Sequence, residues 1–113
     1  MSPERNWKMR IEDILACIDK IRAYTSKMTY EQFRKDEKTV DAVIRNLEII
    51  GEAAGFISLE IQEKHPDLAW LEMRGMRNIM AHEYFGVSLP IIWRAIEQDL
   101  TPLAEGLKRI LES

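Results

Sequence analysis

This chain has few of the features that mark secreted, membrane-spanning or disordered proteins. It contains one cysteine, five glycines and four prolines in 113 residues, which excludes an internal disulfide and leaves no Gly- or Pro-rich linker. The longest apolar runs extend over only a few residues, too short for a transmembrane helix. The opening segment MSPERNWKMR lacks the apolar core of a secretory signal. We therefore expect a cytoplasmic protein without a membrane segment.

The single cysteine, Cys17, lies within an apolar helical pattern. A free cysteine in such a pattern is ordinarily a small buried residue whose packing matters more than its reactivity. We accordingly interpret Cys17 as part of the core and not as a nucleophile.

The charge balance excludes a broad basic surface that would coat nucleic acid. Nineteen acidic residues stand against sixteen basic ones, which gives a net charge of −3. Binding through many phosphate contacts needs an excess of lysine and arginine over a wide surface. Any action on RNA must therefore be local, in a small cationic pocket, or weak.

Apolar residues recur with a helical period along nearly the whole chain. A spacing of i, i+3, i+4 and i+7 predicts amphipathic helices. Thr29 with Gln32 matches a capping box, and Ser88 is a suitable N-cap for a helix with proline in its first turn. The predicted helices comprise residues 4–25, 30–35, 36–64 (ended by Pro66), 68–84 (interrupted by Gly75 and closed by Gly86), a fifth after Ser88, and a last segment restarting at Thr101-Pro102. The consistent fold is all-α, an antiparallel bundle of about five helices in one domain, residues 1–113.

The predicted helix 36–64 carries apolar residues on two sides. Its main stripe is accompanied by a second row, Ile49, Ala53 and Phe56. Small residues between Gly51 and Gly55 would let a neighbouring helix approach closely. Two apolar faces are typical of a central helix, or of one that also meets another subunit.

The densest group of chemically capable residues is Arg77-Asn78-Ile79-Met80-Ala81-His82-Glu83-Tyr84. A guanidinium can neutralise a phosphate and an imidazole can transfer protons near pH 7, so the two together suit metal-free RNA cleavage. Asn78 and His82 share a helix face, whereas Arg77 and His82 lie about 140° apart around an ideal helix. Arg77 could reach round the helix, the helix could fray before Gly86, or two chains could bring two motifs together.

Two copies of the motif would supply both an acid and a base. One imidazole could deprotonate a ribose 2′-hydroxyl, the other could protonate the leaving 5′-oxygen, and Arg77 would stabilise charge on the phosphorane. No metal site is predicted, because His82-Glu83 and the isolated His65 form neither an HExxH motif nor a His/Cys cluster. Spacing alone leaves structural roles open: His82 could cap a helix, and Arg77 could form a surface ion pair.

Further segments accompany this motif through the chain. They are Arg22-Ala23-Tyr24-Thr25, Phe33, Ala42-Val43-Ile44-Arg45-Asn46-Leu47-Glu48-Ile49-Ile50-Gly51-Glu52-Ala53, His65-Pro66, Trp70, Met76-Arg77-Asn78, Ala81-His82-Glu83-Tyr84-Phe85 and Trp93. Taken together they resemble the HepT-like HEPN ribonucleases, the toxin half of prokaryotic HEPN/nucleotidyltransferase (MNT) toxin–antitoxin pairs. The resemblance covers nearly the whole chain.

The resemblance implies an all-α homodimer with a metal-independent endoribonuclease site in the cleft between subunits, acting on RNA without a cofactor. Arg77 and His82 match the family's catalytic pair, and Asn78 fills its polar position. Tyr84 matches the tyrosine on which the partner nucleotidyltransferase, the MNT-type antitoxin, places AMP to silence the toxin. An added phosphate would bring negative charge and bulk beside a site meant for RNA phosphate.

Arg74, one turn before Arg77, is assigned to RNA binding under the same reading, although its spacing alone favours an ion pair with Glu72. The acidic net charge and the two apolar faces also fit a protein of another class. That alternative is a non-catalytic dimeric helical module that binds a partner protein or a nucleotide.

Overall fold

The computed structural model describes residues 6–82 and 88–112, with residues 77–82 described by their backbone. The helices are α1 (Trp7–Thr25), α2 (Tyr30–Lys35), α3 (Glu37–Gly55), α4 (Leu59–Lys64), α5 (Trp70–His82), α6 (Leu89–Arg94) and α7 (Leu100–Glu112), with a π-helical turn, η2 (Ala95–Asp99), before α7. No β-strand occurs within these two ranges. The all-α fold class predicted from the sequence is confirmed.

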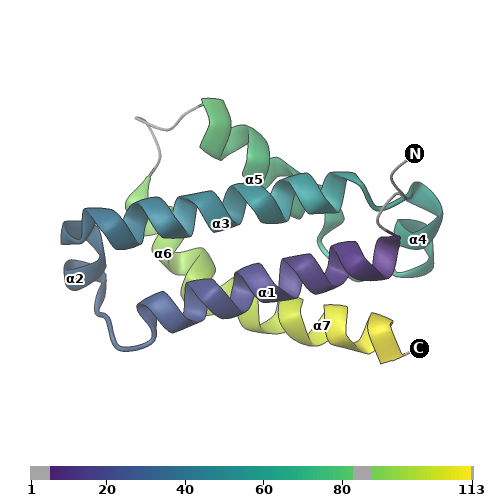
Figure 1. Ribbon diagram of the computed structural model, residues 1–113, viewed down its shortest axis with the longest axis horizontal. Coiled ribbons are helices and arrows are strands. Elements are labelled where there is room, and N and C mark those ends of the chain that lie inside the picture. Colours follow the sequence, from purple (N-terminus) through teal and green to yellow (C-terminus); the bar gives the residue numbers. More distant parts are fainter. Residues whose placement is uncertain (1–5, 83–87, 113) are drawn as a thin grey trace.

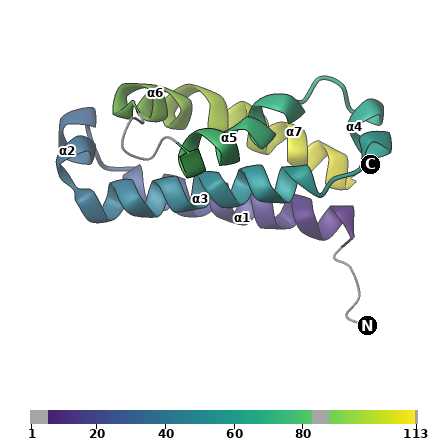
Figure 2. The ribbon, with the colours of Figure 1, turned by 90° about the horizontal axis from the view of Figure 1, so that it is seen from above.

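The two long helices α1 and α3 form one layer of the bundle and run antiparallel beside each other (Figure 1). Seen from above, α5, α6 and α7 lie on one side of this pair (Figure 2). The short helices α2 and α4 stand at opposite ends of the molecule. In this arrangement α5 packs along α3 and α7 packs against α1.

The core fills the space between these layers with aliphatic side chains at helical spacing. In α1 the fully buried isoleucines follow the helical spacing expected of an amphipathic helix: Ile11, Ile14, Ile18 and Ile21. Phe33 of α2 is also fully buried, and its ring centroid lies 5.1 Å from that of Trp93 in α6. Burying each such side chain contributes about 1.5–3 kcal/mol relative to exposure. The core therefore joins both layers and fixes which face each helix turns outward.

The capping box at the start of α2 is present as predicted. The backbone N–H of Gln32 donates to Thr29 Oγ1 at 3.2 Å, and the backbone N–H of Thr29 donates to Gln32 Oε1 at 2.9 Å. Ser88 occupies the N-cap position of α6, although its hydroxyl accepts no capping hydrogen bond. Local sequence signals thus located these two helix starts correctly.

The predicted helix 36–64 is too long. Helix α3 ends at Gly55, and a separate helix, α4, begins at Leu59. The N–H of Phe56 closes α3, and Ser58 then accepts a hydrogen bond from the N–H of Ile61 at 3.4 Å to start α4. Apolar periodicity continues through this break, so it did not reveal that the capping serine Ser58 starts a new helix. His65 consequently caps α4 and not the long helix.

Two other predicted helix interruptions are absent. Helix α5 runs through Gly75, and the helices α6, η2 and α7 form one continuous helical run. A glycine inside a helix costs only about 1 kcal/mol, and buried packing at the start of α5 outweighs it. Pro102 has no N–H to donate to the carbonyl oxygen of Gln98, and in a regular α-helix its ring would clash with that carbonyl. The π-helical turn just before it, closed by the N–H of Leu100 on Ala95, adjusts the register there.

The remaining predicted boundaries agree to within a few residues. The first helix begins at Trp7, and α5 begins at Trp70 and not at residue 68. The predicted end of that helix, at residue 84 with Gly86 closing it, lies outside the described residues. No helix in the described part of the chain is long and apolar enough to cross a membrane.

Cys17 should react slowly with thiol reagents in the folded protein. It is 6 % exposed, and burial raises the pKa of its thiol above the ordinary value, so both access and thiolate fraction are reduced. We expect labelling by an aromatic disulfide at pH 8 to be far slower in buffer than in urea. Rapid stoichiometric labelling of the native protein would show that Cys17 is not the core residue described here.

Candidate functional site

The position of α5 is set by its first turn, which is anchored to the segment before it. Trp70 is 6 % exposed and its indole Nε1–H donates to the carbonyl oxygen of His65 at 2.8 Å. Met73, one turn later, is 1 % exposed. These contacts and the packing of α5 along α3 fix the orientation of the helix that carries the Arg77–His82 segment (Figure 1).

The residues predicted to do chemistry lie on the C-terminal half of α5. Arg77, Asn78 and His82 belong to its continuous helical backbone, and Tyr84 lies outside the described residues. The Cα atoms of Arg77 and His82 are therefore about 140° apart around the axis and about 7.5 Å apart along it. The helix is not frayed between Arg77 and His82. A long reach by Arg77 and a pairing of two chains are the other two predicted ways to bring them together.

Arg74 belongs to the same row of α5 as Asn78 and His82. Each of these positions follows the last by four residues, so successive members are offset by only about 40° around the helix. Arg77 lies beside this row. Of these three residues, Arg74 is the one whose side chain the structure describes. Its contacts therefore show what surrounds the N-terminal end of the row.

Arg74 lines a groove between α3 and α5, which we call the α3/α5 groove. Its volume is about 590 Å³. It is lined by Gly51, Glu52, Gly55, Phe56, Leu71, Arg74 and Gly75. Two large apolar side chains in it are turned to solvent, Phe56 at 60 % and Leu71 at 70 % exposure. The groove thus combines an apolar surface with one guanidinium and one carboxylate.

The guanidinium of Arg74 has an unsatisfied donor. Its Nε atom is shielded from solvent and has no hydrogen-bond partner among the described residues. Arg74 forms no ion pair with any residue in the described ranges. The prediction that Arg74 forms an ion pair with Glu72 is therefore wrong.

A second arginine stands at the edge of the same groove. The guanidinium of Arg10, from α1, lies 4.1 Å from the ring centroid of Phe56, a cation–π arrangement that holds an arginine over an aromatic face. The second apolar row predicted from the sequence includes Phe56. The contact of Arg10 with Phe56 is not predicted from the sequence, because nothing in the α1 pattern connects Arg10 with residues almost fifty positions later.

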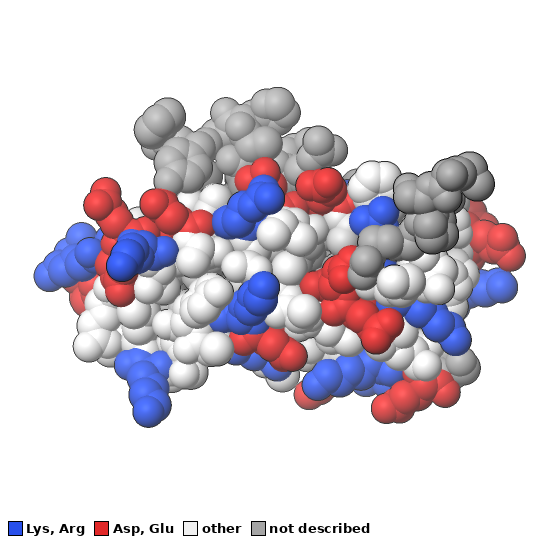
Figure 3. Space-filling model, viewed as in Figure 1, with Lys and Arg blue, Asp and Glu red and all other residues white. Residues whose placement is uncertain are grey.

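The surface charge around this region is mixed. On the face shown in Figure 3, lysine and arginine side chains alternate with aspartate and glutamate, and no continuous basic patch covers the described atoms. Part of this surface charge is neutralised by two exposed ion pairs, Arg45–Glu48 at 3.3 Å and Arg34–Glu31 at 2.8 Å. This agrees with the inference from the net charge that any RNA contact on this face is local.

Comparison with known proteins places the chain in a family. The model of the family described as "Ribonuclease HepT-like" matches residues 14–110. A "Probable ribonuclease HepT" from Thermococcus cleftensis is 40 % identical over 107 residues, which cover 95 % of this chain and 97 % of that protein. A "Putative RNase" from Methanocaldococcus jannaschii is 37 % identical over 105 residues, covering 93 % and 96 % of the two chains.

A third relative, a "Putative RNase" from Caldanaerobacter subterraneus, is 42 % identical over 85 residues, covering 75 % of this chain and 76 % of that one. No solved structure matches significantly. The fold and motif define an all-α protein of the ribonuclease class, and the chain belongs to the HepT-like ribonuclease family. The family recognised from the sequence is confirmed.

Replacing Arg74 with Met should leave stability nearly unchanged, because its Nε atom has no hydrogen-bond partner and its side chain forms no ion pair among the described residues. We expect a change of less than about 0.5 kcal/mol in the free energy of unfolding by urea. Trp70→Phe provides the contrast, since it removes the indole donor to His65 and should cost about 1–2 kcal/mol. An Arg74→Met variant as destabilised as Trp70→Phe would show that Arg74 serves the fold.

Proposed function

We propose that this protein is a metal-independent endoribonuclease, the toxin of a toxin–antitoxin pair. One observation carries the proposal: the continuous helix α5 bears the Arg77–His82 motif directly after Arg74, whose side chain lines the α3/α5 groove. Membership of the HepT-like ribonuclease family supports the substrate class.

The proposed reaction is attack of a ribose 2′-hydroxyl on the adjacent phosphate. An imidazole of His82 takes the 2′ proton as the O2′–P bond forms, and the bond from phosphorus to the 5′-oxygen breaks as that oxygen is protonated. Arg77 stabilises the charge on phosphorus, and Asn78 orients the imidazole. Arg74 holds a neighbouring phosphate. The products carry a 2′,3′-cyclic phosphate and a free 5′-hydroxyl.

The site is proposed to form between two copies of the chain. A homodimer about a twofold axis would set each motif against its copy and supply one imidazole as base and another as acid. The surface beside the motif supports such a contact: Phe56 and Leu71 are exposed apolar side chains. A Cβ atom added at Gly55 or at Gly75 would meet nothing within 4 Å, so a second chain could approach closely there.

Control of the toxin is proposed to act through Tyr84. Attachment of AMP by a nucleotidyltransferase antitoxin would place a phosphate two residues beyond His82. Its negative charge would compete with the RNA phosphate for the guanidinium groups, and its bulk would narrow the site. The modification would thus silence the enzyme without unfolding it.

A non-catalytic dimeric module that binds a partner protein or a nucleotide remains the second candidate. The observation that favours it is the exposed apolar pair Phe56 and Leu71 beside a surface of mixed charge. Such a module would use the same groove without cleaving RNA.

Purified protein should cleave transfer RNA in excess EDTA, and Arg77→Ala and His82→Ala should each reduce the rate by at least about a hundredfold. Arg34→Ala, which removes an exposed arginine paired with Glu31, is the matched control and should retain full activity. Intact RNA with all four proteins, from material whose mass shows unmodified Tyr84, would favour the binding module.

Dimerisation through the α3/α5 groove can be tested with two exposed leucines. Leu71, at 70 % exposure, lies in the groove, whereas Leu59, at 66 %, lies outside its lining. A charge buried in an apolar interface is strongly unfavourable, so Leu71→Glu should give a monomer without ribonuclease activity in sedimentation and cleavage assays. Leu59→Glu should remain an active dimer. An active dimeric Leu71→Glu variant would place the contact elsewhere.

A further inference from the structure

A second depression lies on the other side of α5 from the α3/α5 groove, and we call it the acidic pocket. It has a volume of about 430 Å³. Its lining comes from the segment before α5, from α5 itself, and from the junction of η2 with α7: Asp67, Leu68, Ala69, Glu72, Met73, Met76, Asp99, Pro102 and Leu103. Glu72 and Met76 lie about 100–140° round the helix from Leu71, whereas Gly75 of the groove lies about 40° from it.

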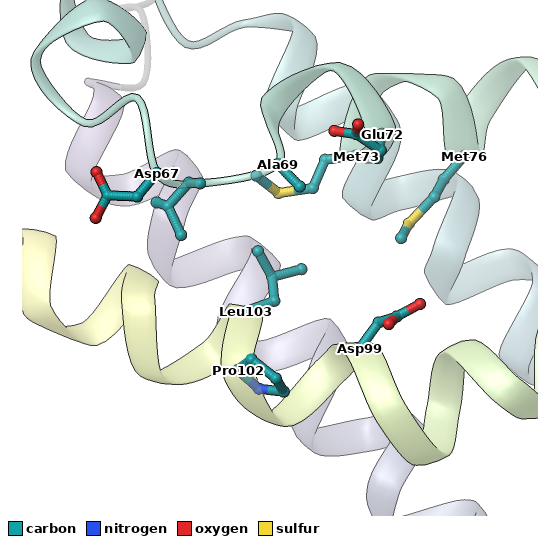
Figure 4. A pocket seen from close by; sticks show the side chains of 9 residues that line it. Asp67, Ala69, Glu72, Met73, Met76, Asp99, Pro102 and Leu103 are labelled. Atoms are coloured by element: carbon teal, nitrogen blue, oxygen red, sulfur yellow. The ribbon is translucent and has the colours of Figure 1, made fainter.

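The interior of the acidic pocket is apolar and adaptable. Figure 4 shows Met73, Met76 and Leu103 facing one another across it. Methionine side chains are flexible and polarisable, so they can adjust to irregular apolar groups. A volume of this size is enough to take up a few apolar side chains.

The charges in the described lining of the pocket are all of one sign. Asp67, Glu72 and Asp99 come from three different elements, and no lysine or arginine is among the described lining residues. None of the three carboxylates forms an ion pair with another residue in the described ranges. Their combined potential would repel RNA and attract a cation.

The arrangement suits an organic cation better than a metal ion. In the part of the chain that the structure describes, no three His, Cys, Asp or Glu residues gather closely enough to hold a metal. Figure 4 shows the Asp67 and Glu72 carboxylates at the periphery, on either side of the apolar interior. Separated rim charges around an apolar interior match a ligand with an apolar body and more than one positive group.

We propose that the acidic pocket docks a basic, apolar peptide segment of a partner protein. Aliphatic side chains of the segment fill the space between Met73, Met76 and Leu103, while neighbouring arginine or lysine groups meet the rim carboxylates. A peptide fits better than a small polyamine, because apolar contacts and charges must be satisfied together. The occupant sits on the side of α5 away from the row of Asn78 and His82, so it leaves that row open.

The test uses a short synthetic peptide alternating leucine with arginine, and protein labelled with ¹³C at methionine methyls. Binding should shift the methyl signals of Met73 and Met76 and leave Met9 and Met28, which lie outside the pocket, unmoved. The double variant Glu72→Gln/Asp99→Asn should weaken binding about tenfold, as expected for two partly exposed charge pairs. Glu97→Gln, which alters a carboxylate of η2 outside the lining, is the matched control and should bind like the parent.

Two further ligands separate the alternatives. A citrulline analogue of the peptide keeps side-chain size and loses the charge, and it should bind at least about tenfold more weakly. Spermidine alone should produce no comparable shift at Met73 and Met76. The proposal is overturned if no methyl shift occurs, if the citrulline peptide binds equally well, if the double variant binds like the parent, or if spermidine reproduces the effect. Ribonuclease activity enters none of these readouts, so failure here and failure of the proposed enzyme are distinguishable.

Discussion

The packing of α5 along α3 is the constraint on which the rest of the molecule's chemistry depends. Trp70 and Met73 bury the first turn of α5, and the indole of Trp70 is hydrogen-bonded to the carbonyl of His65. Once this turn is fixed, helical geometry assigns every later position to a side. Arg74 then lines the α3/α5 groove and Met76 lines the acidic pocket, while the backbone positions of Asn78 and His82 continue the helix row that Arg74 begins.

The two sides of α5 differ in charge. On the groove side the described lining pairs one guanidinium, Arg74, with one carboxylate, Glu52, whereas the charged residues in the described lining of the acidic pocket are all carboxylates. The acidic pocket would therefore repel RNA phosphate more strongly than the groove does. In a chain with a net charge of −3, this difference favours the groove side for an anionic substrate.

Sequence reasoning predicted the fold class, the Thr29 capping box and the burial of Cys17, because periodicity and caps are local signals. It missed the break at Gly55 and wrongly predicted breaks at Gly75 and Pro102, since tertiary packing and a π-helical turn decide those points. It identified the row of the motif on α5 but not the meeting of Arg10 with Phe56, which only the folded chain produces. The roles of Arg77, Asn78, His82 and Tyr84 stay predictions.

The central claim is that RNA is cut by its own 2′-hydroxyl, without a metal ion. The most direct measurement compares two synthetic RNAs in EDTA, one all-ribose and one with a single deoxyribose at the mapped cut. The account predicts that the ribose substrate yields a 2′,3′-cyclic phosphate and a 5′-hydroxyl, and that the deoxy substitution abolishes cleavage at that bond. Equal cleavage of both substrates would contradict it.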